Sequence, residues 1–145
     1  MEFDIEQTDE LLSTTRAVRL RLDLERDVPD DLLLRCIELA EQAPTGAGVS
    51  SRRWLVIRDQ ETKSRLAELY RAAGGSRMID RSQQRGKAED LQERVADSAA
   101  HLAANLEKVP VLVLATIWGV HDGSGRPGLF DSVIQAAWSF CLALR

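Results

Sequence analysis

Several residue types that particular protein classes need are scarce in this sequence. Its 145 residues include 2 cysteines, which are too few for the disulfide framework of a small secreted domain. Aromatic residues make up 5%, a fraction that disfavours a base-stacking platform for single-stranded nucleic acid. The longest apolar run, residues 109–120, is too short to form a membrane-spanning helix.

Positive charge is also in short supply. The 19 Lys and Arg residues are outnumbered by 23 Asp and Glu residues, which gives a net charge of -4, whereas a nucleic-acid-binding domain normally carries clustered cations. The start, Met1-Glu2-Phe3-Asp4, lacks the cationic and apolar regions of a secretion signal. Because 44% of the residues are hydrophobic, a packed core can form. The composition predicts a soluble, cytoplasmic, globular chain with no nucleic-acid or membrane partner.

The cysteines and histidines show no spacing that indicates chemistry. Cys36 and Cys141 lie among apolar residues in helical patterns, where free cysteine behaves as a small buried hydrophobe. His101 and His121 form no metal-ligand pattern with them. We therefore expect neither a metal site nor a nucleophilic cysteine.

The hydrophobic pattern predicts alternating helices and strands, a mixed α and β class. Thr8 is expected to cap a first helix. A second helix is expected to begin at Val28-Pro29, with Pro29 in the first helical position. Two apolar sets on that helix predict that it is largely buried; they are Leu33, Ile37, Ala40 and Leu32, Cys36, Leu39.

The rest of the chain continues the alternation. A continuous apolar run predicts a strand at Trp54–Ile57, and Asp59 is expected to cap a helix that Gly74-Gly75 ends. The polar, basic residues 76–86 predict a mobile loop. The remaining expected elements are an amphipathic helix over 91–106, a strand at 111–117 buried on both faces, a glycine-rich loop at 119–128 and an apolar helix at 129–144.

Residues 1–145 are expected to form a single domain that is incomplete at its C-terminal end. The last helix reaches Arg145 without a glycine cap or a polar tail. A sheet of two strands is also marginal by itself. We therefore expect that the chain continues or that a partner supplies further strands.

Two motifs in the glycine-rich loop match functional signatures only loosely. Gly123–Gly128 fits the G-x-G-x-x-G pattern of dinucleotide-binding turns, but residues 119–122 separate it from the strand and Pro127 removes an amide donor. The pair His121-Asp122 has no serine elbow beside it. A solvent-exposed loop is the better interpretation of both motifs.

Two clusters of arginines and hydroxyls are more informative. Arg16, Arg19 and Arg21 follow Ser13-Thr14-Thr15, and forked guanidinium donors beside hydroxyls suit a phosphate group. Arg16 and Arg19 are spaced to share a helical face. The alternative is a solvated basic patch that pairs with Asp23, Glu25 and Asp27.

The second cluster is the stretch Thr45-Gly46-Ala47-Gly48-Val49-Ser50-Ser51-Arg52-Arg53. Glycines let a flat ligand approach the backbone closely, and the hydroxyls and cations add donors. The alternative is an ordinary connection between a helix and a strand.

Three segments together resemble the nitroreductase family of FMN-dependent oxidoreductases. They are Thr15-Arg16-Ala17-Val18-Arg19, Ala43-Pro44-Thr45-Gly46 and Trp54-Leu55-Val56-Ile57. Residues 101–113 resemble the family's approach to its central strand, and residues 131–139 resemble the start of its core helix. The segments keep the family's order over almost the whole chain.

The resemblance implies an α+β, nitroreductase-like fold with a central mixed sheet sandwiched by helices, and a homodimer that binds FMN at the subunit interface. It places Arg16, Ala17 and Arg19 on the FMN phosphate and the loop that starts at Thr45 beside the flavin. The implied FMN-binding residues are Arg16, Ala17, Arg19, Thr45, Gly46, Ser51, Arg52 and Arg53. The last three stand where the family has an Asn and a Gln, in a loop that is slightly longer here.

The implied activity is hydride transfer from NAD(P)H through FMN to a nitroaromatic, quinone or similar electron-poor acceptor. Such a ping-pong reaction needs no protein nucleophile, because the flavin carries the chemistry. Family members continue beyond the core helix into strands and flavin ligands that this sequence does not contain. The alternatives are a dehalogenase or ene-type reductase on the same scaffold, or a non-catalytic helical interaction module.

Overall fold

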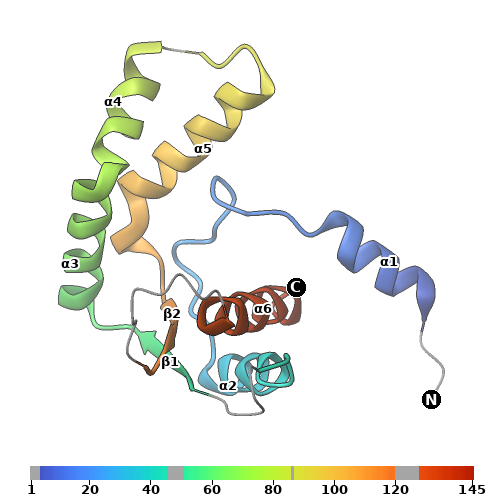
Figure 1. Ribbon diagram of the computed structural model, residues 1–145. Helices are drawn as coiled ribbons and strands as arrows, with labels where there is room; N and C mark the ends of the chain where they lie inside the picture. The colour runs from blue at the N-terminus through green and yellow to red at the C-terminus, as the bar shows by residue number, and fades with distance from the viewer. Residues whose placement is uncertain (1–3, 46–50, 86, 120–127) are drawn as a thin grey trace. The chain divides into compact units, whose positions relative to one another are not determined.

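The computed structural model describes residues 4–45, 51–85, 87–119 and 128–145 (Figure 1). Its helices are α1 Ile5–Thr14, α2 Asp30–Ala40, α3 Gln60–Tyr70, α4 Ser76–Arg85, α5 Leu91–Asn105 and α6 Gly128–Ala143, and its strands are β1 Arg52–Ile57 and β2 Leu112–Ile117. No helix in these ranges has the length and apolar character needed to cross a membrane. Most of the glycine-rich loop, including His121-Asp122 and most of the G-x-G-x-x-G match, lies outside the described residues.

The chain forms two compact units. The first comprises Met1–Arg16, Val28–Val56 and Val113–Arg145, and the second comprises Ala17–Asp27 and Ile57–Leu112. Helices α1, α2 and α6 therefore belong to the first unit together with most of both strands, whereas α3, α4 and α5 belong to the second.

Strands β1 and β2 pair as a 2-stranded sheet. The Trp118 N–H donates to the Ser51 carbonyl at 2.7 Å, and the Thr116 hydroxyl donates to the Arg53 carbonyl at 2.9 Å, so the strands run antiparallel. Both predicted strands are confirmed, but the expected burial of both faces of the second is wrong. Its residues are half-buried and Leu114 is exposed, because the sheet stops at two strands in the part of the chain that the structure describes.

Helix α2 packs against α6 to form the core of the first unit (Figure 1). The expectation that both apolar sets of this helix are buried is wrong, because α6 covers one face only. Leu32 and Leu39 are exposed. The buried residues of the two helices are Leu33, Cys36 and Ala40 from α2, and Ala136 and Phe140 from α6.

The helix starts differ from expectation by a few residues. Asp4, not Thr8, caps α1, because its carboxylate accepts from the Gln7 N–H at 3.0 Å and aspartate is a stronger cap than threonine. Pro29 is the N-cap of α2 rather than its first helical residue. The predicted Asp59 cap of α3 is confirmed, since its carboxylate accepts from the Thr62 N–H at 2.7 Å.

Residues 76–85 of the expected mobile loop instead form helix α4, which packs against α5 in the second unit (Figure 1), and residue 86 lies outside the described residues. The chain does turn out of α3 at the predicted glycines, because Gly74 has a φ of 142°, a value that favours glycine. Helix α4 then begins directly after the kink. The hydrophobic pattern did not predict α4 because its residues are mostly polar. Arg, Gln and Met are nevertheless good helix formers, whatever their hydropathy.

Candidate functional site

The loop expected beside a flat ligand is flanked by a buried arginine. Arg52, the first residue of β1, is only 4% exposed. Its guanidinium donates to the carbonyls of Glu41 and Ala43, both at 3.1 Å, and to the carbonyl of Ser132 at 3.2 Å. Glu41 and Ala43 follow α2, whose last carbonyls have no partner within the helix. Arg52 therefore holds the turn that follows α2 and joins it to α6, whereas carbonyls at the end of α2 itself accept from the backbone N–H groups of this turn.

A carboxylate completes the cluster around Arg52. Glu41 Oε1 lies 3.3 Å from Arg52 Nε, and the same oxygen accepts from the Trp54 indole N–H at 2.7 Å. The Trp54 ring packs against Phe140 at a centroid distance of 5.2 Å. Glu41, Arg52 and Trp54 thus fix the two flanks of the loop against each other.

The other residues of this loop lie nearer to solvent. Arg53 is exposed, and its guanidinium donates to the Arg52 carbonyl at 2.7 Å. Thr45 and Ser51 are half-buried, and Gly46 lies outside the described residues. The structure therefore brings Ser51, Arg52 and Arg53 together with the flank that carries Thr45, but gives Arg52 a different surrounding from Arg53.

The first arginine cluster is not helical. Helix α1 ends at Thr14, and residues 15–19 adopt no helix, so Arg16 and Arg19 do not share a helical face as their spacing suggested. The Arg16 guanidinium donates to the Thr15 carbonyl at 2.7 Å, and Ala17 is exposed. Arg19 is half-buried and donates to the Ser98 hydroxyl at 3.4 Å.

Two of the three acids that could neutralise this cluster, Asp23 and Asp27, have other partners. Asp23 accepts from the backbone N–H groups of Glu25 and Arg26, and these bonds lower its pKa below the usual range. Asp27 pairs with Arg58 at 2.7 Å. Within the described residues, no ion pair joins the cluster to these acids, so the alternative of a self-neutralised patch finds no support. The cluster meant here consists of the guanidinium groups of Arg16, Arg19 and Arg21.

Sequence reasoning missed the part of Glu41 in this arrangement. An acidic residue at the end of a helix is unfavourable next to the helix dipole, and Glu41 directly follows α2. Such a residue indicates a cationic partner, which is Arg52 here. Nothing local in the sequence indicates the Ser132 carbonyl, because it comes from a distant helix.

Comparison with known proteins identifies the family. The model of the nitroreductase family matches residues 12–145. No curated protein matches the chain. One structure of similar fold is a BluB-like flavoprotein from Clostridium difficile 630, with a TM-score of 0.60, 20% identity, and coverage of 97% of this chain and 69% of that one.

A second structure of similar fold is the FMN-dependent nitroreductase NfnB from Mycobacterium smegmatis, in complex with NADPH. Its TM-score is 0.61, its identity 17%, and the match covers 97% of this chain and 71% of that one. Likeness at these identities concerns the fold alone, and it confirms the expected nitroreductase-like α+β class. Together with the match over residues 12–145, it shows that the chain belongs to the nitroreductase family of oxidoreductases.

Proposed function

We propose that the protein is an FMN-dependent oxidoreductase that uses NAD(P)H to reduce a nitroaromatic, quinone or similar electron-poor acceptor. Bound FMN would supply the hydride chemistry. The observation that carries the proposal is the state of Arg19, whose guanidinium lies in a family-matched segment with no carboxylate partner in the described residues. A guanidinium in that state suits a phosphate group.

Arg16 and Arg19 would hold the phosphate of the cofactor. Hydrogen bonds that involve charged groups contribute about 1.5–3 kcal/mol each. The exposed guanidinium of Arg16 and the single long bond of Arg19 to Ser98 leave donors of both residues available. Ala17 is exposed and carries only a methyl group, which leaves room for a ligand.

Ser51, Arg53 and the Thr45 flank would lie beside the flavin ring, with Gly46 in the same loop. Arg53 is a better candidate than Arg52 to donate where negative charge develops on reduction, because the Arg52 guanidinium already serves three backbone carbonyls. Arg52 would act as a positioning residue that holds the flanks of the loop.

Titration of FMN against an arginine variant tests the phosphate assignment. We expect Arg19→Ala to lower FMN affinity at least about tenfold, the loss of one charge-assisted bond. Arg21→Ala is the matched control, since it removes an exposed arginine from the same segment. Unchanged FMN affinity in Arg19→Ala, or an equal loss in Arg21→Ala, would remove the assignment.

Colour tests the activity itself. The purified protein should carry a yellow flavin that NADH or NADPH bleaches in the absence of oxygen. A colourless protein that ignores added FMN would instead favour the non-catalytic interaction module.

A further inference from the structure

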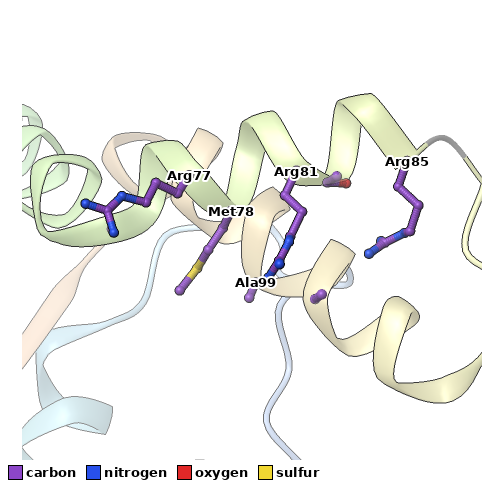
Figure 2. A pocket seen from close by; sticks show the side chains of 8 residues that line it. Arg77, Met78, Arg81, Arg85 and Ala99 are labelled. Carbon is purple, nitrogen blue, oxygen red and sulfur yellow. The ribbon is translucent and has the colours of Figure 1, made fainter.

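A cavity of about 600 Å³ lies between α4 and α5 in the second unit (Figure 2). Its volume falls within the usual range for small-molecule sites, about 300–1,000 Å³. The lining residues that matter here are Arg77, Met78, Arg81, Arg85, Ala96 and Ala99.

The sequence explains why this space is open. Gly74 turns the chain between α3 and α4, and nothing lies within 4 Å of the position that a side chain would take there. Across the cavity, α5 presents Ala96 and Ala99. Larger residues at these positions would fill the space, so the glycine kink and the small side chains together keep it open.

The cavity wall on α4 is strongly basic. Arg77, Arg81 and Arg85 follow one another at intervals of four residues, so they lie on successive turns of one helix face. Like charges at this spacing destabilise a helix. In residues 71–87 the only carboxylate is Asp80, and the cations are Arg71, Arg77, Arg81, Arg85 and Lys87.

Only one of the three arginines on α4 is neutralised. Arg85 pairs with Asp97 and lies 3.8 Å from Glu93, which holds the end of α4 to α5. Arg77 and Arg81 are exposed, and neither makes an ion pair with any residue that the structure describes. Figure 2 shows Arg81 and Met78 on the side of α4 that faces α5, with Arg81 extending toward Ala99.

We propose that this cavity binds a small organic phosphate ester. Its phosphate would accept from Arg81, which extends into the cavity, and from Arg77, which points away from Arg81 in Figure 2 and would turn toward it. A phosphate monoester carries about -1.5 to -2 charges at pH 7 and would match these two unpaired guanidinium groups. Its organic part would contact Met78, Ala96 and Ala99. Inorganic phosphate alone would leave most of the cavity unfilled.

Calorimetric titration of the 145-residue chain with 1-naphthyl phosphate tests the proposal. Separate titrations with inorganic phosphate and with 1-naphthol test the phosphate half and the organic half of this ester. We expect saturable binding of the ester and at least about tenfold weaker binding of either half. Naphthol that binds as tightly as the ester would overturn the proposal, as would an ester that does not bind saturably.

Variants locate the site. We expect Arg77→Gln and Arg81→Gln each to weaken ester binding at least about tenfold, and Ala96→Leu to abolish it by filling the cavity. Ala96 is exposed, so its replacement should leave the circular dichroism spectrum unchanged. Arg94→Gln is the matched control, because Arg94 is an exposed arginine of α5 outside the cavity. An equal loss in Arg94→Gln would show diffuse charge attraction and overturn the proposal.

A competition distinguishes this site from a flavin site. The ester titration uses no added flavin and measures binding rather than flavin reduction, so its result does not depend on the function proposed above. We expect saturating FMN to leave the bound ester in place. Displacement of the bound ester by FMN from the unmodified chain would assign the cavity to the flavin and overturn the proposal of a separate ligand.

Discussion

Arg52 is a charged side chain that the fold has removed almost wholly from water. Burial of an unpaired guanidinium would be very costly. Here three carbonyls and the Glu41 carboxylate surround it, so the charge is compensated and the carbonyls that follow α2 have a donor. Removing the guanidinium would take away the donor that these three carbonyls share and the cation that faces the Glu41 carboxylate.

We therefore predict that Arg52→Ala lowers the free energy of unfolding by about 3–5 kcal/mol, because Arg52 serves three carbonyls and each buried polar group that loses its partner costs about 1–3 kcal/mol. Arg53→Ala is the control, because it removes the neighbouring, exposed arginine and should change stability by about 0.5 kcal/mol or less. Urea unfolding measures both variants. Equal effects of the two would contradict the assigned role of Arg52.

At the level of elements, the join between α3 and α4 depends on two glycines for different reasons. Gly74 has a positive φ of 142° but open space around it, whereas a side chain on Gly75 would lie 3.2 Å from Ala103 Cβ and 3.1 Å from the Tyr70 carbonyl oxygen. The first glycine is needed for conformation and the second for close packing.

We predict that Gly74→Ala destabilises the chain by about 1–3 kcal/mol through backbone strain. Gly75→Ala should also destabilise it, but there Ala103→Gly should recover part of the loss by removing one of the contacting atoms. Thermal unfolding of the single and double variants measures both effects. Recovery of Gly74→Ala by Ala103→Gly would contradict this division of roles.

Local chemistry predicted some elements well. The apolar runs located both strands, and the Asp59 cap and the glycines of the kink were evident because each depends on neighbours in sequence. Helix α4 was missed because its residues contribute little apolar surface. The exposed second face of α2 was missed because the number of covering layers is a property of tertiary packing.

The candidate site was predictable only in outline. The arginine and loop segments were located from the sequence and lie within the range that matches the family, and their binding roles stay predictions. The different surroundings of Arg52 and Arg53 could not be predicted from the sequence. The pleat turns neighbouring strand residues to opposite sides, but the sequence does not reveal which of the two sides is buried.

At the scale of the whole molecule, we expect the loss of stability at low pH to involve carboxyl groups of the second unit. Arg71 donates to the Glu107 carboxylate at 2.6 Å, which lowers the pKa of Glu107 below its usual 4.5. Thr62 likewise lowers the pKa of Asp59 below 3.8. A carboxyl group with a lowered pKa stabilises the fold above its unfolded-state pKa, and this stabilisation is lost as pH falls through the folded-state pKa.

We thus predict that stability falls as pH drops below about 4.5. Glu107→Gln should be less stable near neutral pH but should lose less stability on acidification, because Gln does not titrate. Melting temperatures from about pH 6 to pH 3 measure this difference. Parallel curves for the two proteins would show that the Glu107 pair contributes nothing to acid unfolding.

Assembly is the remaining property at this scale. Ile134 and Trp138 lie one turn apart on α6 and are 62% and 50% exposed, so we propose that this face carries the homodimer contact. Ile134→Glu should then shift the sedimentation coefficient toward that of a monomer. Leu34→Glu is the control, since it places the same charge on an exposed leucine of α2. A dimer that survives Ile134→Glu would exclude this face.

The cluster around Arg52 also has a consequence for how the sequence can diverge. Neither Glu41 nor Arg52 can be exchanged alone without leaving a buried charge or unsatisfied carbonyls. Both positions should therefore change together among relatives that keep this loop, as a pair that still supplies donors to the carbonyls that follow α2. Trp54, which shares the Glu41 carboxylate, should follow them, giving a three-position pattern of covariation.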